Sequence, residues 1–460
     1  MMKGASSTII DAIGTTPIVR LNKVASHVAS DIFVKLEFLN PGGSMKDRVA
    51  LNIIRDAERR GLLQPGGTIV EATSGNTGAG LALVSAIRGY KCIFVMPDKM
   101  SQEKIATLRA FGAEVVICPT AVEPADPRSY YEVTKRIVRE TEGAFHANQY
   151  HNPANPEAHY VSTAPELWEQ TGGELDVFVA GMGTGGTISG CGRYFKERKP
   201  GFQIIGVDPI GSLYYDYVKT GRLAKAFSYS VEGIGEDFLP STMNLKIIDE
   251  IVRVDDKECF LMTRRLVREE GIFCGGSSGA AVAGAVRYAE KLGAEKKNIL
   301  VLLPDSAQKY LSKIFDDRWM KENGFLEEAD PLGAVVDLVK SKGRRPIVTI
   351  SRGSTIREAI GKLQEFGISQ LPVLDGGRLA GLVTEIDLLN HLVTNPGQTD
   401  GLIDELVESD YATVTPQTKV KLLRTIFNDA KLVLVLDRDE LLGVITKIDL
   451  IEYLAGRTQA

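Results

Sequence analysis

The sequence "LDVFVAGMGTGGTISG" (residues 175–190) combines a short apolar run, a glycine-rich loop and the start of a helical pattern. Apolar runs of the same kind recur elsewhere in the chain, at "GTIVEA" (67–72), "KCIFVMP" (91–97), "FQIIGVD" (202–208) and "NILVLLP" (298–304). Short apolar runs that alternate with helical patterns are typical of parallel strands buried on both faces. Residues 18–304 therefore predict an α/β fold in which ligands bind at the carboxyl ends of parallel strands.

The composition excludes several classes of protein. The net charge of −5 and the lack of a basic cluster argue against binding to nucleic acid or to an anionic membrane surface. No apolar run reaches the roughly 18 residues of a spanning helix, and the N-terminal segment lacks the apolar core of a signal peptide. The five cysteines form no C-x-x-C pair and no H-E-x-x-H motif occurs, so we expect a cytoplasmic protein without a metal site.

The C-terminal part of the chain contains an internal repeat. The segment "GLVTEIDLLNHL" begins at Gly381, and the similar segment "GVITKIDLIEYL" begins at Gly443. Two copies indicate a paired module, because a solenoid needs three or more repeats. We therefore predict a large α/β domain, a charged linker with a short helix around 332–340, and two repeats, at residues 1–322, 323–343, 344–398 and 399–460.

Lys46 lies in "NPGGSMKDR" (40–48), behind two glycines and a serine. Ser44 and Asp47 have the spacing of a capping box, which would place Lys46 at the second position of a helix. The helix dipole and burial would both lower the pKa of the amine there, and Schiff-base formation requires a neutral amine. A solvated surface lysine is the simpler alternative, so the interpretation depends on the rest of the chain.

Two loops between a strand and a helix predict anion binding. In "EATSGNTGAG" (71–80), small hydroxyl residues and backbone N–H groups at a helix start are suited to a carboxylate. The loop in "AGMGTGGTISG" (180–190) is suited to a phosphate. Its Gly181, Gly183 and Gly186, followed by Asp208, also match the dinucleotide-binding fingerprint, so an NAD-dependent oxidoreductase remains an alternative.

Taken together and in this order, "NPGGSMKDR", "TSGNTG" and "GTGGT" resemble fold-type II pyridoxal-phosphate enzymes of the cysteine synthase/cystathionine β-synthase family, over residues 5–320. The resemblance implies two parallel-sheet subdomains like those of the tryptophan synthase β chain. It also implies that Lys46 is the catalytic lysine and carries pyridoxal 5′-phosphate, and that Asn76 bonds the ring hydroxyl. The phosphate-binding residues would be Gly183, Thr184, Gly185, Gly186 and Thr187, and those for the substrate carboxylate Thr73, Ser74 and Thr77.

Ser277, in "CGGSSG" (274–279), would by the same resemblance meet the pyridine nitrogen. A hydroxyl partner leaves that nitrogen largely unprotonated, so the ring is a weaker electron sink, which suits loss of a β-leaving group better than transamination. The alternative is a simple glycine-rich helix start.

Three stretches resemble the cystathionine β-synthases more than the O-acetylserine sulfhydrylases: "NPGGSMKD", "NQYHNPANPEAHY" (148–160) and "SVEGIGEDFLP" (230–240). The resemblance implies that Tyr150 and the loop with Gly233 and Gly235 line the entrance for homocysteine, with Gln149 also binding substrate. Glu236 stands where a neutral aromatic residue is common in this family.

The repeats resemble a pair of CBS (Bateman) regulatory domains. The resemblance implies an adenosyl ligand, S-adenosylmethionine or a nucleotide, held by Thr384 with Asp387 and by Thr446 with Asp449. Helix capping alone also explains this spacing. No counterpart of the N-terminal haem-binding extension of animal enzymes is found, and "ERKPGFQ" (197–203) lacks the redox C-x-x-C of some relatives, so no haem is expected.

The resemblance therefore implies a pyridoxal-phosphate-dependent β-replacement that joins serine and homocysteine to cystathionine with loss of water. Hydrogen sulfide from cysteine is expected as a side reaction, and a homodimer, linked further through the regulatory pairs, as the assembly. The alternatives are a cysteine synthase with a regulatory pair, the NAD oxidoreductase, and a ligand sensor with an inactive core.

Overall fold

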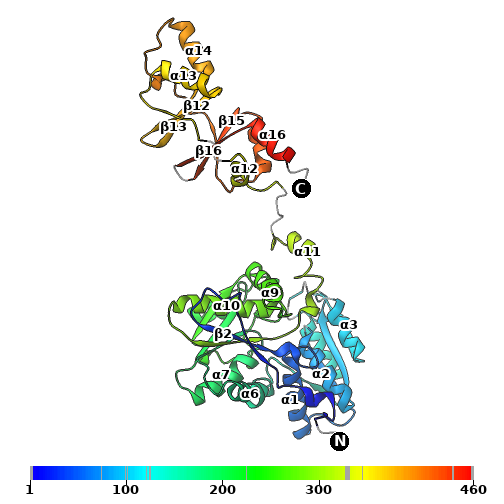
Figure 1. The fold of residues 1–460 in the computed structure, drawn as a ribbon. Coiled ribbons are helices and arrows are strands. Elements are labelled where there is room, and N and C mark those ends of the chain that lie inside the picture. The colour runs from blue at the N-terminus through cyan, green and yellow to red at the C-terminus, as the bar shows by residue number, and fades with distance from the viewer. Residues whose placement is uncertain are drawn as a thin grey trace. The chain divides into compact units, whose positions relative to one another are not determined.

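The computed structural model describes residues 4–73, 75–98, 100, 102–120, 122–123, 126–223, 225–326, 332–343, 346–437 and 440–456. The chain divides into two compact units, residues 1–327 and 328–460 (Figure 1). No helix of the described residues is long and apolar enough to cross a membrane.

The first unit contains a six-stranded sheet in the order β1-β2-β10-β7-β8-β9, in which all neighbours except β1 and β2 are parallel. Its strands are β1 Ile18–Arg20, β2 Asp31–Leu36, β7 Val177–Gly181, β8 Gln203–Pro209, β9 Glu250–Val254 and β10 Asn298–Leu303. A second sheet, with the order β5-β4-β3-β6, is fully parallel. Its strands are β3 Thr68–Ala72, β4 Lys91–Pro97, β5 Glu114–Cys118 and β6 Ala144–His146.

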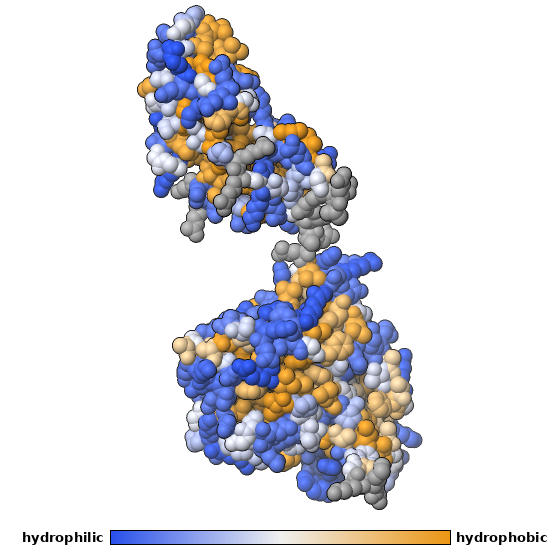
Figure 2. Space-filling model, in the orientation of Figure 1, coloured by the Kyte–Doolittle hydropathy of each residue, from blue (hydrophilic) through white to orange (hydrophobic). Residues whose placement is uncertain are grey.

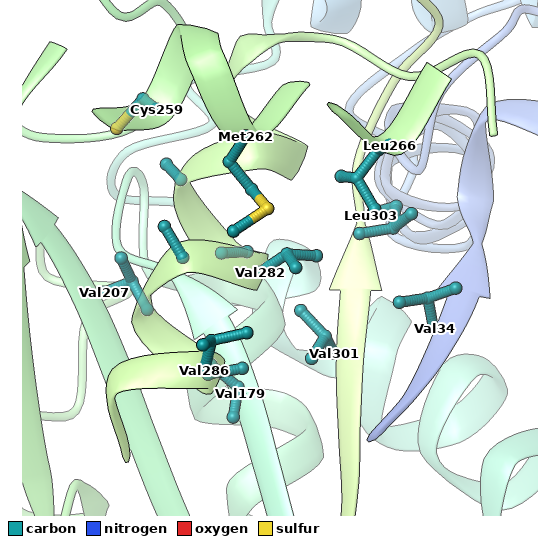
Figure 3. Close-up of a cluster of buried hydrophobic side chains, with 14 of the residues drawn as sticks. Val34, Val179, Val207, Cys259, Met262, Leu266, Val282, Val286, Val301 and Leu303 are labelled. Atoms are coloured by element: carbon teal, nitrogen blue, oxygen red, sulfur yellow. The ribbon is translucent and has the colours of Figure 1, made fainter. Parts of the chain in front are cut away.

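Helices cover both faces of the six-stranded sheet. Successive residues of one strand point to opposite faces, so Val179 and Val301 pack under α9 (Asp256–Glu270) and α10 (Gly276–Leu292), as Figure 3 shows. Phe178 and Leu300 pack on the other face, against α6 (Ala164–Gln170) and α7 (Gly186–Arg198). Burial on both faces explains why these strands are apolar without alternation.

The remaining helices of this unit surround the four-stranded sheet or connect the two sheets. They are α1 Lys46–Arg59, α2 Asn76–Arg88, α3 Gln102–Ala110, α4 Tyr130–Glu140, α5 Ala154–Ala158, α8 Tyr214–Thr220 and α11 Asp317–Glu322. Helices α1 and α2 share one hydrophobic core with β3 and β4. Helices α1, α2, α7 and α10 each begin beside the carboxyl end of a strand. The first turns of these helices contain several of the candidate site residues that were predicted from the sequence.

The second unit contains the two repeats, each with a three-stranded sheet of one parallel and one antiparallel pairing. The elements of the first are β11 Ile350–Ser351, α13 Ile356–Phe366, β12 Gln370–Asp375, β13 Arg378–Thr384 and α14 Glu385–Thr394. Those of the second are β14 Ala412–Val414, α15 Val420–Ile426, β15 Leu432–Asp437, β16 Glu440–Thr446 and α16 Lys447–Gly456. Both repeats therefore have the same order of elements: strand, helix, strand, strand, helix.

Helix α12 (Val335–Ser341) lies within the segment that the sequence assigns to the linker. Its Val335 and Leu338 are fully buried in the core of the second repeat, and Figure 1 shows the helix beside α16. The segment after α14 instead belongs to the first repeat, because Ile403 is buried in that core. The two repeats are therefore interleaved along the chain, which a linear division at residues 343 and 398 does not show.

Two helices of the second unit, α14 and α16, have exposed apolar side chains. Ile386, Leu389 and Val393 of α14 are exposed and lie at helical spacing, and Figure 2 shows apolar side chains gathered over this helix. In α16 the exposed Ile448 and Ile451 occupy the matching positions of the repeat.

Candidate active site

A pocket at the carboxyl ends of the six-stranded sheet brings Lys46 together with the glycine loop after β7. Its walls come from four separate segments of the first unit: Met45 and Lys46; Ala180, Gly181, Gly183, Thr184, Gly185, Thr187 and Ile188; Gly233 and Ile234; and Leu302 with Pro304. Backbone hydrogen bonds fix the first of these segments on the end of β10, from Met45 N–H to Pro304 O (2.9 Å) and from Ser306 N–H to Gly43 O (3.3 Å). The two glycines before Lys46 thus form the turn that docks the start of α1 against the other sheet.

The predicted capping box at the start of α1 is wrong. The helix begins at Lys46, and the Asp47 carboxylate accepts the N–H of Gly42 (2.6 Å) rather than that of Ser44. The Ser44 hydroxyl accepts the Lys46 N–H at 3.3 Å. Because the Gly42–Gly43 turn folds back over the helix start, Asp47 holds this turn, and Lys46 occupies the first helical position instead of the second.

The Lys46 amine lies beside the glycine loop, donating to the Thr184 hydroxyl at 3.5 Å. Burial lowers the pKa of Lys46 to about 8, while the negative charges of Glu236 and Glu71 partly oppose this shift. An amine with this pKa has an appreciable neutral fraction near neutral pH and can act as a nucleophile and as a base.

The glycine loop has the form of a phosphate site. Gly185 has a φ of +85°, and a Cβ at that position would lie 2.5 Å from the Met243 Cα. A Cβ at Gly186 would overlap the Asn155 side chain, and one at Gly183 would lie 2.9 Å from Gly233 O. The glycines therefore let the loop pack closely against Asn155, Gly233 and Met243, where side chains would clash. The loop lies at the start of α7, where backbone N–H groups attract anions. These residues fit the phosphate of the cofactor that the sequence implies.

Two further predicted cofactor residues lie at helix starts on the same side of the sheets. Ser277, in the first turn of α10, is 2% exposed, and its hydroxyl lies 4.0 Å from the Cβ position of Gly233. Asn76, at the start of α2, donates to Asp305 Oδ2 (2.8 Å) and accepts from the Lys309 amine (2.6 Å). One N–H of the Asn76 amide is left for a ring hydroxyl.

The predicted carboxylate-binding residues are only partly described, because Ser74 lies outside the described residues. The Thr73 hydroxyl accepts the N–H groups of Gly75 (3.1 Å) and Gly78 (3.2 Å), so it already acts as a cap of α2. Thr77 donates to the Gln149 side-chain oxygen at 2.5 Å, which joins α2 to the segment 148–160.

The predicted entrance residues lie around an aromatic wall. The Tyr150 and Phe238 rings pack edge to face with centroids 5.1 Å apart. Gly233 and Gly235 have φ values of +86° and +77°, and the Gly235 N–H donates to Met182 O (2.6 Å). This bond fixes the loop that carries Glu236 against the end of β7.

Several residues that support the site were not found from the sequence. Asn155 donates to the Thr184 hydroxyl (3.1 Å) and to Gln149 O (2.8 Å). His159, in a π-helical turn (His159–Thr163), bonds Thr187 at 3.2 Å. Thr242 donates to Thr184 O and to Tyr150 O. Only Asn155 and His159 carry a sequence signal, because they lie in the segment 148–160 that supports the family resemblance.

Glu71 is a buried carboxyl group behind this site. Its oxygens accept the N–H groups of Asn148 (2.5 Å) and Gln149 (3.2 Å). Burial raises the pKa of Glu71 to about 8, against the effect of those two hydrogen bonds and of Lys46. Glu71 therefore positions the Gln149–Tyr150 backbone.

Asp208, which completes the dinucleotide fingerprint, has a different role in this fold. The side chain is fully buried, and its Oδ2 accepts the Tyr215 N–H at 2.9 Å. Burial raises the pKa of Asp208 to about 6. A carboxylate that caps α8 from inside the protein is poorly placed to receive ribose hydroxyls.

In the second unit, both predicted regulatory pairs cap a helix. Asp387 accepts from the N–H and the hydroxyl of Thr384 (2.8 and 2.6 Å), and Asp449 accepts likewise from Thr446 (2.7 and 2.6 Å). Asp449 also forms an ion pair with Lys342 at 2.7 Å. The described residues contain no group of three or more His, Cys, Asp or Glu side chains suited to a metal ion.

Comparison with known proteins bears on both units. The chain matches the family model for pyridoxal-phosphate dependent enzymes over residues 9–305, and the CBS-domain model over residues 336–394 and 403–456. It is 41% identical to the cystathionine beta-synthase of Dictyostelium discoideum, covering 98% of this chain and 93% of that protein. It is 36% identical to the cystathionine beta-synthase of Saccharomyces cerevisiae, covering 97% of each.

Two solved structures align with the first unit. A hydrogen sulfide-producing enzyme from Fusobacterium nucleatum has a TM-score of 0.62 at 36% identity, covering 67% of this chain and 100% of that one. An O-ureido-L-serine synthase has a TM-score of 0.62 at 37% identity, covering 69% of this chain and 99% of that one.

Proposed function

Since the chain belongs to the cystathionine beta-synthase family of pyridoxal-phosphate-dependent enzymes, we propose that it joins serine and homocysteine to form cystathionine and water. The observation that carries the proposal is the common pocket of Lys46 and the Gly183–Thr187 loop. A lysine of lowered pKa beside an anion-binding loop supports a site for an aldehyde cofactor that bears a phosphate.

The residues of the chain have the following proposed roles in cofactor binding, substrate binding and proton transfer. When bound, pyridoxal phosphate supplies an aldehyde for amine capture and a ring that withdraws electrons from the substrate α-carbon. The Gly183–Thr187 loop binds the phosphate, the Ser277 hydroxyl meets the ring nitrogen, and Asn76 meets the ring hydroxyl. Lys46 holds the cofactor, takes the α-proton of serine and delivers a proton to the departing hydroxide. The substrate-binding residues are Thr73, Ser74, Thr77, Gln149, Tyr150, Gly233 and Gly235.

Substitution of Lys46 tests this assignment directly. Lys46→Ala should lower cystathionine formation by about two to four orders of magnitude, the usual range for loss of an acid–base group. Lys135→Ala, which removes an amine that is 62% exposed, serves as the control and should leave the rate unchanged. Equal rates in wild type and Lys46→Ala would refute the assignment. A wild-type protein that turns over acetylserine with sulfide, but not serine with homocysteine, would favour a cysteine synthase instead.

Cysteine is a second donor that the comparisons favour, since one structural relative is a hydrogen sulfide-producing enzyme. We propose that cysteine reacts in place of serine at the same site and releases sulfide. Sulfide release from cysteine, with and without homocysteine, measures this reaction. We also propose that the enzyme works without haem in the cytoplasm; an absorption spectrum of the purified protein checks the first point.

For the second unit, we propose that the repeats bind an adenosyl ligand and that the chain forms a homodimer or a larger homo-oligomer. The exposed apolar residues of α14 and α16 support association through the repeats, because water disfavours such faces. Sedimentation of the wild type and of a Leu389→Glu variant tests this association.

A further inference from the structure

Glu236 has a fixed backbone beside the pocket. Its N–H donates to the Ser212 hydroxyl (3.1 Å), and its carbonyl oxygen accepts the Leu213 N–H (3.1 Å). The two preceding residues are Gly235, bonded to Met182 O, and Ile234, which lines the pocket with Lys46. The side chain therefore starts from a rigid segment, two residues from the wall of the active site.

The carboxylate of Glu236 is not used by the fold. Within the part of the chain that the structure describes, no hydrogen bond or ion pair involves its two oxygens, although the residue is half-buried. Two other acidic groups near the site are engaged: Glu71 accepts two backbone N–H groups, and Glu232 pairs with Lys104 and Lys313. The Glu236 oxygens, in contrast, remain available to a ligand.

The charge of Glu236 acts on the catalytic lysine and on the aromatic wall. It is the strongest of the charges that oppose the lowered pKa of Lys46. Burial, followed by the neighbouring charge of Asp237, raises the pKa of Glu236 to about 8, and Lys46 opposes the shift. Burial raises the pKa of five tyrosines of α4, α8 and the adjoining loops, and the charge of Glu236 raises it further: Tyr130, Tyr131, Tyr150, Tyr214 and Tyr229.

None of these tyrosines competes as a base. Burial raises the pKa of Tyr150 well above its ordinary value of 10, so the phenol keeps its proton. A thiol has a pKa of about 8.5, and proton transfer is most efficient between groups of similar pKa near the working pH. The Glu236 carboxyl group meets this condition.

We propose that Glu236 accepts the thiol proton of the second substrate; this inference rests on the proposed function. The S–H bond breaks, the proton moves to a Glu236 oxygen, and the sulfur electron pair forms the C–S bond at the β-carbon from which hydroxide has left. Glu236 then passes the proton to Lys46, which returns it to the α-carbon. The α-proton of serine has already left in the water, so atoms and charge balance over the cycle.

The test separates the two halves of the reaction in the holoenzyme. Glu236→Gln keeps the size of the side chain and should leave the spectral change on adding serine alone within about twofold. The rate constant for the second step with homocysteine should fall about 100-fold or more, and the acidic limb of its pH profile should disappear. Asp237→Asn, which alters an exposed neighbouring carboxylate, should keep the maximal rate but move the acidic limb to lower pH, because the charge of Asp237 raises the pKa of Glu236.

A second acceptor distinguishes a base from a purely structural residue. An aromatic thiol that is already a thiolate at pH 7 needs no base, so Glu236→Gln should react with it at nearly the wild-type rate. An equal loss with both acceptors, or an equal loss in the serine step, overturns the proposal, as does a variant indistinguishable from wild type. A wild type that binds the cofactor but forms no cystathionine refutes the proposed function itself, and the role of Glu236 with it.

Discussion

Gly186 is the residue of the glycine loop at which an added Cβ would meet the closest contact. A Cβ there would overlap the Asn155 side chain, and Asn155 holds both the Thr184 hydroxyl and Gln149 O. We predict that Gly186→Ala raises the dissociation constant of pyridoxal phosphate at least tenfold, about 1.4 kcal/mol, in an absorbance titration. Gly201→Ala is the matched control, since nothing lies within 4 Å of its Cβ position. Equal affinities of the two variants would contradict this account of the loop.

At this scale, the sequence selected residues of contiguous motifs that the structure brings together. Lys46, Gly183 and Thr184 line one pocket, and their roles in catalysis and cofactor binding stay predictions. Thr242 and Asp305 were not predicted, because their hydrogen-bond partners, Thr184 and Asn76, lie far away in the sequence. Contacts of this kind depend on how two sheets are packed, and no local pattern encodes them.

Helix α1 is anchored by buried ion pairs of Arg48, two residues after Lys46. Arg48 is 4% exposed and forms two hydrogen bonds of 2.8 Å with Glu37, which is fully buried and follows β2. Its guanidinium also contacts Glu166 of α6. The network therefore ties the helix that carries the lysine to the six-stranded sheet and to the helix beneath it.

We predict that Glu37→Gln lowers the free energy of unfolding of the first unit by about 3 kcal/mol, because the buried Arg48 charge loses the more deeply buried of its two carboxylate partners. Urea unfolding followed by tryptophan fluorescence measures this, since Trp168 and Trp319 both belong to that unit. Arg59→Ala removes an ion pair on the same helix whose arginine is 79% exposed, and should change stability by less than about 0.5 kcal/mol. Similar losses of free energy in both variants would show that the buried ion pairs stabilise the first unit no more than the exposed ion pair does.

Whole elements were predicted well where burial alone determines them. The apolar runs at 91–97 and 298–304 correspond to β4 and β10 within one residue, since a strand covered on both faces has an unmistakable composition. The start of α1 was predicted less well, because the backbone turn at Gly42–Gly43 decides which N–H group Asp47 accepts. A spacing rule for capping boxes contains no information on such a turn.

At the scale of the molecule, the repeat was visible in the sequence but its interleaving was not. The N–H of Val335 donates to Thr418 O (2.8 Å), and that of Ile356 donates to Gly401 O (2.9 Å). Helix α12 thus belongs to the second repeat although it precedes the first in the chain, whereas the first repeat continues without a break past residue 398. The chain therefore crosses between the two repeats twice, which couples them, so a ligand bound to one is placed to affect the other.

The interleaving also makes the two predicted ligand sites unequal. Lys342 comes from the end of α12 and neutralises Asp449, whereas no ion pair of Asp387 is found among the described residues. S-adenosylmethionine carries a cationic sulfonium, which a neighbouring lysine disfavours and an unpaired aspartate favours. The first repeat should therefore bind S-adenosylmethionine more tightly than the second.

We predict that Asp387→Asn weakens S-adenosylmethionine binding at least tenfold, while Asp449→Asn changes it less than about threefold. Calorimetric titration of the full chain gives both affinities, and cystathionine formation with and without the ligand shows whether binding reaches the active site. Both aspartates cap a helix through the preceding threonine, so the two substitutions remove the same local hydrogen bonds and control for each other. The reverse order of affinities would mean that Lys342 leaves Asp449 when the ligand binds and that the ion pair does not control selectivity.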